Sequence, residues 1–214
     1  MILRGFVQAG GGSTRFGADK ALVPLGGKTM LQRACELLSG VCDDVTIVAP
    51  AGKYAGAPWP VLADRWPGEG PLGGILTSLL HASQLDSGAG VRATEHEPRV
   101  FALIVSCDMP FLTHEFLSFL RDKTSQSKAQ VVVPQSTSGL EPLCACWSVH
   151  AASGVRAAFD SGIRKVTDAM NRLPMEVLDA SAWKRFDTNG RLFWNMNTPA
   201  DYEAARRIFE AKGP

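Results

Sequence analysis

Short unbroken apolar runs alternate along the chain with segments whose apolar residues recur at helical spacing. The run at residues 100–106 (VFALIVS) is the most apolar. We predict strands over residues 3–9, 45–49, 61–62, 100–106, 131–133, 143–147 and 176–178. We predict helices over residues 29–38, 72–82, 149–159 and 166–173, and two more that begin after the capping residues Thr113 and Thr198. At the second of these, the pattern Thr198-Pro-Ala-Asp201 gives Asp201 a capping role.

The order of these elements predicts an α/β fold with three layers, αβα, in which a mostly parallel twisted sheet is covered on both faces. Unbroken apolar strands need this cover, since neither face meets water. Residues 85–99 are polar and aperiodic, which indicates a surface insertion. The polar turn at residues 136–139 belongs either to a hairpin or to a flexible lip. We expect one domain over residues 1–214.

Composition and charge exclude several classes of protein. The 214 residues are 45% hydrophobic and 20% charged, with a formal net charge of +1, so we expect a soluble globular protein without the positive field of a general nucleic-acid or membrane-surface binder. No apolar run approaches the roughly 18 residues of a membrane-spanning helix. The N-terminus becomes glycine-rich too early for a secretion signal. We therefore expect a cytoplasmic protein in which any anion site is local.

Five cysteines, at positions 35, 42, 107, 144 and 146, form no CxxC pair and have no histidine at metal-ligand spacing. We expect reduced, buried thiols. Cys144 and Cys146 share one face of a predicted strand, but a metal or redox site there would need further ligands. The four histidines are scattered, and no triad is visible in the sequence.

A glycine-rich segment with three cations leaves the first predicted strand. Residues 9–20 read AGGGSTRFGADK. Glycines allow backbone N–H groups to wrap an anion at close range, and Arg15, Lys20 and Lys28 add positive charge that only Asp19 opposes. The spacing matches neither the P-loop nor GxGxxG. We interpret the segment as a phosphate-binding loop, while a merely flexible loop is the competing interpretation.

Asp108 follows directly after the most apolar strand, within the sequence SCDMP. Ligands of open α/β sheets bind at the carboxyl ends of the strands, so this carboxylate is expected to face the crevice. A single carboxylate suits Mg²⁺, which keeps its other positions for water and substrate phosphates. The alternative is that Asp108 caps the turn before Pro110.

Two further segments carry candidate ligands. Residues 64–74 (DRWPGEGPLGG) form a loop dense in proline and glycine that could line a flat base. Asn195 and Asn197 are two residues apart on an extended segment, where both amides could face a phosphate or a metal-bound water. An ordinary turn and capping of the last helix are the competing interpretations.

Together these segments resemble the molybdenum cofactor guanylyltransferase (MobA) family and the wider nucleotidyltransferases with a GT-A-like α/β fold. The shared pattern is AGGxSxRFGxDKAL, an aspartate followed by GPLGG, CDMPF, and NxNTP with an acidic residue beyond. Here these motifs occupy residues 9–22, 64 with 70–74, 107–111 and 195–201. Order and spacing agree from about residue 3 to residue 208.

The resemblance implies a role for each matching residue. Nucleotide contacts would come from Ala9, Gly10, Gly11, Ser13 and Asp64, phosphate contacts from Lys20 and Arg15, base contacts from Gly70, Pro71 and Leu72, and acceptor contacts from Arg164, Lys165, Asn195 and Asn197. Asp108 would bind Mg²⁺, and Arg15, Lys20 and Asp108 would be the catalytic residues. One position departs from the family, because Gln8 stands where leucine is usual. A polar side chain there bears on the choice between guanine and cytosine.

The implied reaction is transfer of GMP from MgGTP to molybdopterin or its metal-loaded form, with release of pyrophosphate. The acceptor is already a phosphate anion, so no general base is required. Two alternatives are a cytidylyltransferase or other small-molecule nucleotidyltransferase on the same fold, and a nucleotide-binding adaptor without turnover. A glycosyltransferase is disfavoured because Asp108 is not part of a DxD pair. The resemblance further implies transient contact with cofactor-delivery proteins or apo-molybdoenzymes.

Overall fold

The computed structural model describes residues 1–10, 19–87 and 99–211. The strands are β1 (Ile2–Gln8), β2 (Pro24–Leu25), β3 (Lys28–Thr29), β4 (Asp44–Ala49), β5 (Val61–Ala63), β6 (Val100–Ser106), β7 (Val131–Ser136), β8 (Gly139–Leu140), β9 (Cys144–Ser148) and β10 (Met175–Leu178). The α-helices are α1 (Met30–Ser39), α2 (Pro71–Ser87), α3 (His114–Gln126), α4 (Ala152–Asp160), α5 (Val166–Met170), α6 (Ala180–Trp183) and α7 (Pro199–Ala211), and 3-10 turns η1 to η3 cover Lys20–Leu22, Val149–Ala151 and Lys184–Phe186.

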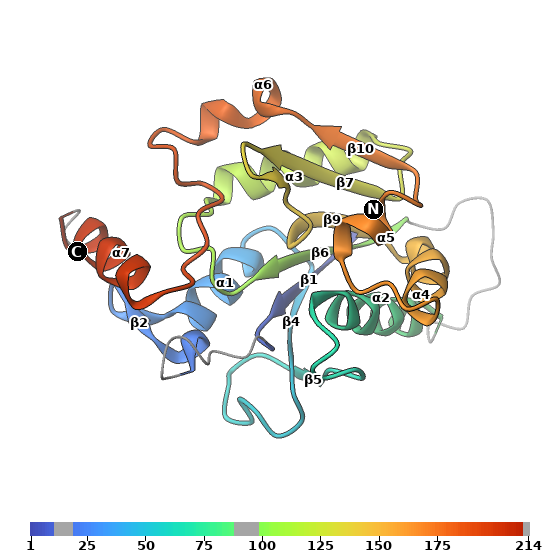
Figure 1. Cartoon of the computed structure of the whole chain (residues 1–214), viewed down its shortest axis with the longest axis horizontal. Helices are drawn as coiled ribbons and strands as arrows, with labels where there is room; N and C mark the ends of the chain where they lie inside the picture. The colour runs from blue at the N-terminus through green and yellow to red at the C-terminus, as the bar shows by residue number, and fades with distance from the viewer. Residues whose placement is uncertain (11–18, 88–98, 212–214) are drawn as a thin grey trace.

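The main sheet has the strand order β10-β7-β9-β6-β1-β4-β5. Its pairings are parallel except at β9, which runs antiparallel to both β6 and β7, while β8 forms a short hairpin with β7. The prediction of a mostly parallel α/β sheet is confirmed. Because β1, β4, β5 and β6 run in one direction, their carboxyl ends lie at the same edge (Figure 1).

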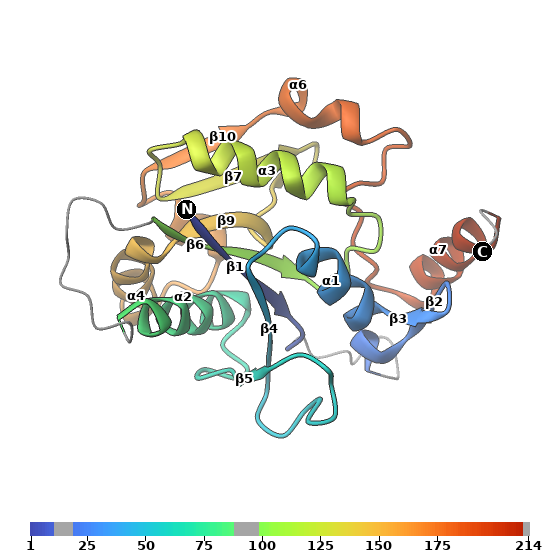
Figure 2. The same cartoon turned by 180° about the vertical axis from the view of Figure 1, so that it is seen from behind.

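Helices cover both faces of the sheet, as the apolar strands predicted. Figure 1 shows α2, α4 and α5 in front of the sheet, and Figure 2, which views the molecule from behind, shows α1 and α3 on the opposite face. Strand β1 divides its side chains accordingly: Leu3 and Val7 pack in the cluster with α1 and α3, and Phe6 packs in the cluster with α2. In β6 every residue from Val100 to Val105 is buried, which explains its unbroken apolar sequence.

Several predicted elements differ from the observed ones in length or detail. Helix α2 continues to Ser87, so the predicted insertion overlaps its last turn, and residues 88–98 lie outside the described residues. The predicted helix 149–159 begins as a 3-10 turn, and the helix predicted over residues 166–173 ends at Met170. Ser136 pairs with Gly139, so of the two alternatives for the polar turn the hairpin is correct. Strands β2 and β3 and helix α6 were not predicted.

The five cysteines are free thiols, as expected, and four of them are buried, while Cys42 is only partly buried. Cys144 and Cys146 point to the same face of β9 and are fully buried, and burial raises the pKa of both thiols. Among the described residues, no group of three or more histidine, cysteine, aspartate or glutamate side chains could hold a metal ion. No helix in this part of the chain is long and apolar enough to cross a membrane.

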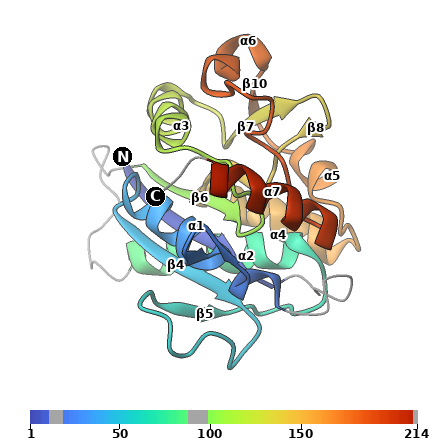
Figure 3. The same cartoon turned by 90° about the vertical axis from the view of Figure 1, so that its left-hand side faces the viewer.

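Helix α7 lies apart from the main sheet, beside the β2–β3 hairpin (Figure 2), and Figure 3 shows the molecule from the side that carries this helix. A reciprocal capping arrangement begins it. The Asp201 backbone N–H donates to Thr198 Oγ1 at 3.1 Å, and Asp201 Oδ2 accepts from the backbone N–H groups of Asn197 and Thr198 at 2.9 and 2.7 Å. The predicted capping role of Asp201 is confirmed.

The hydrogen bonds of Asp201 predict that part of the free energy of unfolding depends on pH. Partial desolvation raises its pKa, but the hydrogen bonds from Asn197 and Thr198 outweigh this, so the pKa lies below its usual value. A carboxylate with a lowered folded-state pKa stabilises the fold above its unfolded pKa of about 4 and loses this contribution as the pH falls further. We expect Asp201→Asn to lower Tm at pH 7, and the difference from wild type to shrink below about pH 4. A pH-independent difference in thermal melts would contradict this role.

Candidate functional site

Three predicted site residues follow strands that end at the same edge of the sheet. Gly10 comes after β1, Asp64 directly after β5, and Asp108 two residues after β6. The backbone N–H of Cys107 donates to the Gln8 carbonyl at 3.2 Å, which holds the segment after β6 against the end of β1. The parallel sheet therefore brings together segments that are far apart in sequence.

Asp108 forms an ion pair at this edge. Its Oδ2 lies 2.7 Å from Lys20 Nζ, and only 16% of each side chain is exposed. Oδ1 is buried and is without a hydrogen-bond partner among the described residues. A buried carboxylate oxygen without a partner is costly, so this atom fits a hard cation that prefers oxygen ligands. Magnesium takes one or two protein carboxylates in such sites, so a single aspartate is a sufficient donor set.

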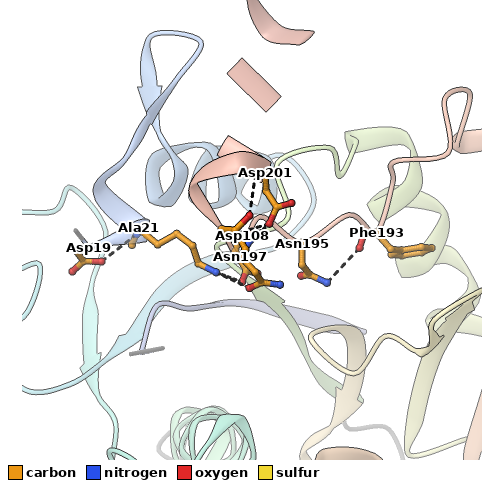
Figure 4. Close-up of polar contacts among 9 residues, drawn as sticks. Asp19, Ala21, Asp108, Phe193, Asn195, Asn197 and Asp201 are labelled. Atoms are coloured by element: carbon orange, nitrogen blue, oxygen red, sulfur yellow. Dashed lines mark hydrogen bonds and ion pairs between the residues drawn. The ribbon is translucent and has the colours of Figure 1, made fainter. Parts of the chain in front are cut away.

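Lys20 also contacts the segment before α7. Its Nζ donates to Asn197 Oδ1 at 3.0 Å, and the backbone N–H of Met196 donates to the Asp108 carbonyl at 2.9 Å. Asn195 instead donates its amide to the Phe193 carbonyl at 3.4 Å, as Figure 4 shows. The two asparagine side chains thus have different partners, and Asn197 is the one that reaches the Lys20–Asp108 pair.

The loop after β5 is fastened to α2 through Asp64. Its Oδ1 accepts from the Trp66 backbone N–H at 3.1 Å and from Thr77 Oγ1 at 2.9 Å. Gly70 has a φ of +78°, a conformation that favours glycine. Leu72 was expected to line the base, but its side chain is fully buried in the core beneath α2. Only its backbone is left for a ligand, and that part of the prediction is corrected.

The Gln8 side chain fills the space beside Gly74 in the first turns of α2. Its Nε2 lies 3.0 Å from Ser78 Oγ, which in turn donates to the Gly74 carbonyl at 2.8 Å. A Cβ atom on Gly74 would lie 2.0 Å from Gln8 Oε1. The polar side chain that departs from the family pattern is therefore directed at the helix, and glycine at position 74 makes room for it.

Arg164 and Lys165, the expected acceptor ligands, are not brought together with Asn195 and Asn197. Arg164 pairs with Glu69 at 2.5 Å and donates to the carbonyl of Phe159, and Lys165 lies 3.6 Å from Asp168. Both belong to the segment between α4 and α5, on the α2 side of the sheet. The positive charge of both residues could be read from the sequence, but their position in the fold could not. In the fold, Arg164 holds the loop that ends at Gly70 through its contact with Glu69.

The expected loop residues Gly11, Ser13 and Arg15 lie outside the described residues. The two ends of that segment are described. At its carboxyl end Asp19 caps η1 by accepting from the Ala21 backbone N–H at 3.1 Å, and it also contacts Tyr54 and Lys53. Neither Tyr54 nor Lys53 was predicted as a site residue, because no motif or spacing in the loop between β4 and β5 marks them.

The Gln8–Gly74 contact predicts non-additive stability. Gly74→Ala improves helix propensity by about 1 kcal/mol, but in wild type it displaces the Gln8 carboxamide and breaks its bond to Ser78, which costs a similar amount. We therefore expect Gly74→Ala to stabilise a Gln8→Ala variant by about 1 kcal/mol and to give no such gain in wild type. Urea unfolding of the four proteins measures this, and an equal effect in both backgrounds would exclude the contact.

Comparison with known proteins agrees with this architecture. Residues 5–173 match the family described as the MobA-like NTP transferase domain. A molybdenum cofactor guanylyltransferase from Desulfosudis oleivorans is 31% identical over 209 residues, covering 97% of this chain and 96% of the relative. One from Rhizobium johnstonii is 32% identical over 215 residues, covering 98% and 94%.

Solved structures of other proteins have a similar fold. Molybdopterin-guanine dinucleotide biosynthesis protein A from Archaeoglobus fulgidus superimposes with a TM-score of 0.79 at 25% identity, covering 97% of this chain and 99% of that one. The 2-C-methyl-D-erythritol 4-phosphate cytidylyltransferase from Thermus thermophilus, at 12% identity and a TM-score of 0.63, shares the fold alone.

Proposed function

Because this chain belongs to the MobA-like NTP transferase family, we propose that it transfers GMP from GTP to the terminal phosphate of molybdopterin or its metal-loaded form and releases pyrophosphate. The observation that carries the proposal is the cluster of Lys20, Asp108 and Asn197 at the carboxyl ends of the strands. It brings together a cation for phosphate, an amide, and a carboxylate of which one oxygen has no partner in the part of the chain that the structure describes.

The chemistry needs position and charge more than proton transfer. The attacking group is a phosphate anion, so no general base is assigned. Lys20 would hold the triphosphate, and Asp108 would hold Mg²⁺ through Oδ1, the oxygen that has no partner among the described residues. Bound magnesium would supply positive charge to the phosphates. Catalysis then rests on in-line alignment of the two substrates and on the cancellation of charge at the α-phosphate and the departing pyrophosphate.

The ion pair between Lys20 and Asp108 has a role before substrate binds. It keeps both side chains at the carboxyl ends of the strands and neutralises two charges that are largely shielded from water. A cation on the other carboxylate oxygen would weaken the attraction of Asp108 for the ammonium group, which would then be available to phosphate. Entry of the metal and of the nucleotide would therefore be coupled.

The setting of the reaction is part of the proposal. Five free thiols suit the reducing environment of the cytoplasm. We propose that residues 1–214 act as a single domain, since the main sheet collects strands from residue 2 to residue 178. Delivery of the product by transient contact with cofactor-delivery proteins or apo-molybdoenzymes is an extension that rests on the family alone.

A nucleotide panel tests the proposed function. We expect pyrophosphate release from GTP in the presence of molybdopterin and Mg²⁺, at a kcat/KM well above that for CTP or ATP. A preference for CTP would indicate a cytidylyltransferase. Binding of GTP without pyrophosphate release would indicate an adaptor.

Replacement of the carboxylate tests the assignment of Asp108. We expect Asp108→Asn to lower kcat about a hundredfold, the effect of roughly 3 kcal/mol of transition-state stabilisation. The fold should persist, because an asparagine amide oxygen can still accept from Lys20, which also keeps its hydrogen bond to Asn197. Mg²⁺ should raise the Tm of the wild type but not of the variant.

The matched control is Asp179→Asn. Asp179 caps α6 by accepting from the Ser181 backbone N–H at 2.9 Å, and asparagine caps equally well. We expect this variant to keep wild-type turnover. Near wild-type turnover of Asp108→Asn at saturating Mg²⁺ would refute the assignment of Asp108.

A further inference from the structure

Tyr54 has an unusual backbone conformation. Its φ is +56°, and among the described residues it is the only one other than glycine with a positive φ. This region is unfavourable for a bulky side chain and is kept only where the surroundings hold it. Gly52 and Gly56 lie two residues away on either side, yet the left-handed position between them carries a tyrosine. Interactions of the side chain must offset the cost.

The Tyr54 hydroxyl meets three oxygen atoms from two other segments. Its Oη lies 3.0 and 2.9 Å from the two carboxylate oxygens of Asp19, and 3.3 Å from the carbonyl oxygen of Ala9. Lys53 Nζ lies 3.0 Å from Asp19 Oδ2. The half-buried ring packs against the apolar cluster that contains Ala9 and Ala21. Ring and hydroxyl together therefore connect the loop after β4 with β1 and η1.

The pKa values of Tyr54 and Asp19 favour a protonated hydroxyl as donor and an ionised carboxylate as acceptor. Desolvation raises the pKa of Asp19, but the hydrogen bonds from Lys53 and Tyr54 outweigh it and keep this carboxyl ionised. Burial and the neighbouring Asp19 charge raise the pKa of the tyrosine hydroxyl. The hydroxyl thus keeps its proton and donates to a carboxylate, which is a stronger bond than one between neutral groups.

The two segments that Tyr54 joins lie on either side of the glycine-rich segment. Ala9 follows the last residue of β1, and Asp19 precedes Lys20 and caps the turn that carries it. Lys20 in turn reaches Asp108. Besides the direct contacts of its ammonium group, Lys20 is thus linked to the end of β1 by a chain of contacts that begins at the Tyr54 hydroxyl.

We propose that Tyr54 is a positioning residue for the nucleotide site, whose hydroxyl holds Asp19 beside Ala9 and so sets the place of Lys20. The proposal rests on the proposed function only in taking a nucleoside triphosphate as the ligand of Lys20. Tyr54 itself touches no substrate. Without its hydroxyl, part of the binding energy of the nucleotide is spent on ordering Asp19 and η1.

The test is calorimetric titration of the full chain with MgGTP, which needs no acceptor. We expect Tyr54→Phe to weaken binding about tenfold, the size of one charge-assisted hydrogen bond, with a Tm within a few degrees of wild type. The control is Tyr202→Phe, which removes the other tyrosine hydroxyl, 3.1 Å from the Pro24 carbonyl oxygen. We expect it to bind MgGTP within twofold of wild type.

A second variant separates positioning from general stability. Asp19→Asn keeps a capping side chain for η1 but removes the charge that Tyr54 and Lys53 contact. If Tyr54 acts through Asp19, the double variant binds MgGTP about as weakly as the weaker single variant. Independent, multiplying effects would overturn the proposal. So would wild-type affinity of Tyr54→Phe, or equal losses in both tyrosine variants.

The readouts also separate this proposal from the proposed function. In pyrophosphate-release assays, Tyr54→Phe should raise KM for GTP more than it lowers kcat, because the hydroxyl acts on nucleotide placement. A wild-type protein that binds MgGTP but transfers no GMP would end the proposed function and leave the binding test intact. A Tyr54→Phe variant with normal affinity and normal KM would end only the positioning role.

Discussion

The site depends on the contact between Lys20 and Asp108, two residues separated by 88 positions in the chain. Neither residue forms a site by itself. Lys20 lies on the short turn η1 after the first strand, and Asp108 lies on the segment after β6. The contact exists because β1 and β6 are parallel neighbours in full register, so their carboxyl ends leave the sheet side by side. The apolar sequence of β6 serves this geometry, since a strand buried on both faces gives the segment carrying Asp108 a rigid origin.

The electrostatics of this contact explain why the site is ready for a ligand. A largely buried ion pair is favourable only where its remaining polar atoms are also satisfied. At Asp108 one oxygen contacts Lys20, and the other has no partner among residues 1–10, 19–87 and 99–211, so a cation would remove the cost of leaving it unpaired. Asn197, fixed by the capping of α7, gives Lys20 a second acceptor. The last helix thus contributes to the site through its first turn, although it packs far from the sheet centre.

The loop between β5 and α2 is also held in place by side-chain contacts. Asp64 ties it to α2 through Thr77, Trp66 packs against Phe159 of α4, and Glu69 pairs with Arg164. Residues that a motif would assign to ligand binding are here engaged in holding the loop. In the loop between β4 and β5, Tyr54 holds η1 in the same way, through its hydrogen bond to Asp19. Two loops of different sequence are therefore held by polar contacts to neighbouring elements.

The sequence by itself determined the order of the longer strands and helices, the mostly parallel sheet, the burial of four of the five cysteines and the capping roles of Thr113 and Asp201, because each follows from local periodicity or from a pattern a few residues long. It also placed Asp108 and Asp64 at strand ends. The tertiary structure alone decided that Asn197 and not Asn195 reaches Lys20, that Arg164 pairs with Glu69, that Gln8 turns toward Ser78, and that Tyr54 spans to Asp19. These contacts join side chains that are 35 or more residues apart in the sequence. Strand order and helix packing bring them together, and no spacing along the chain predicts which of them meet.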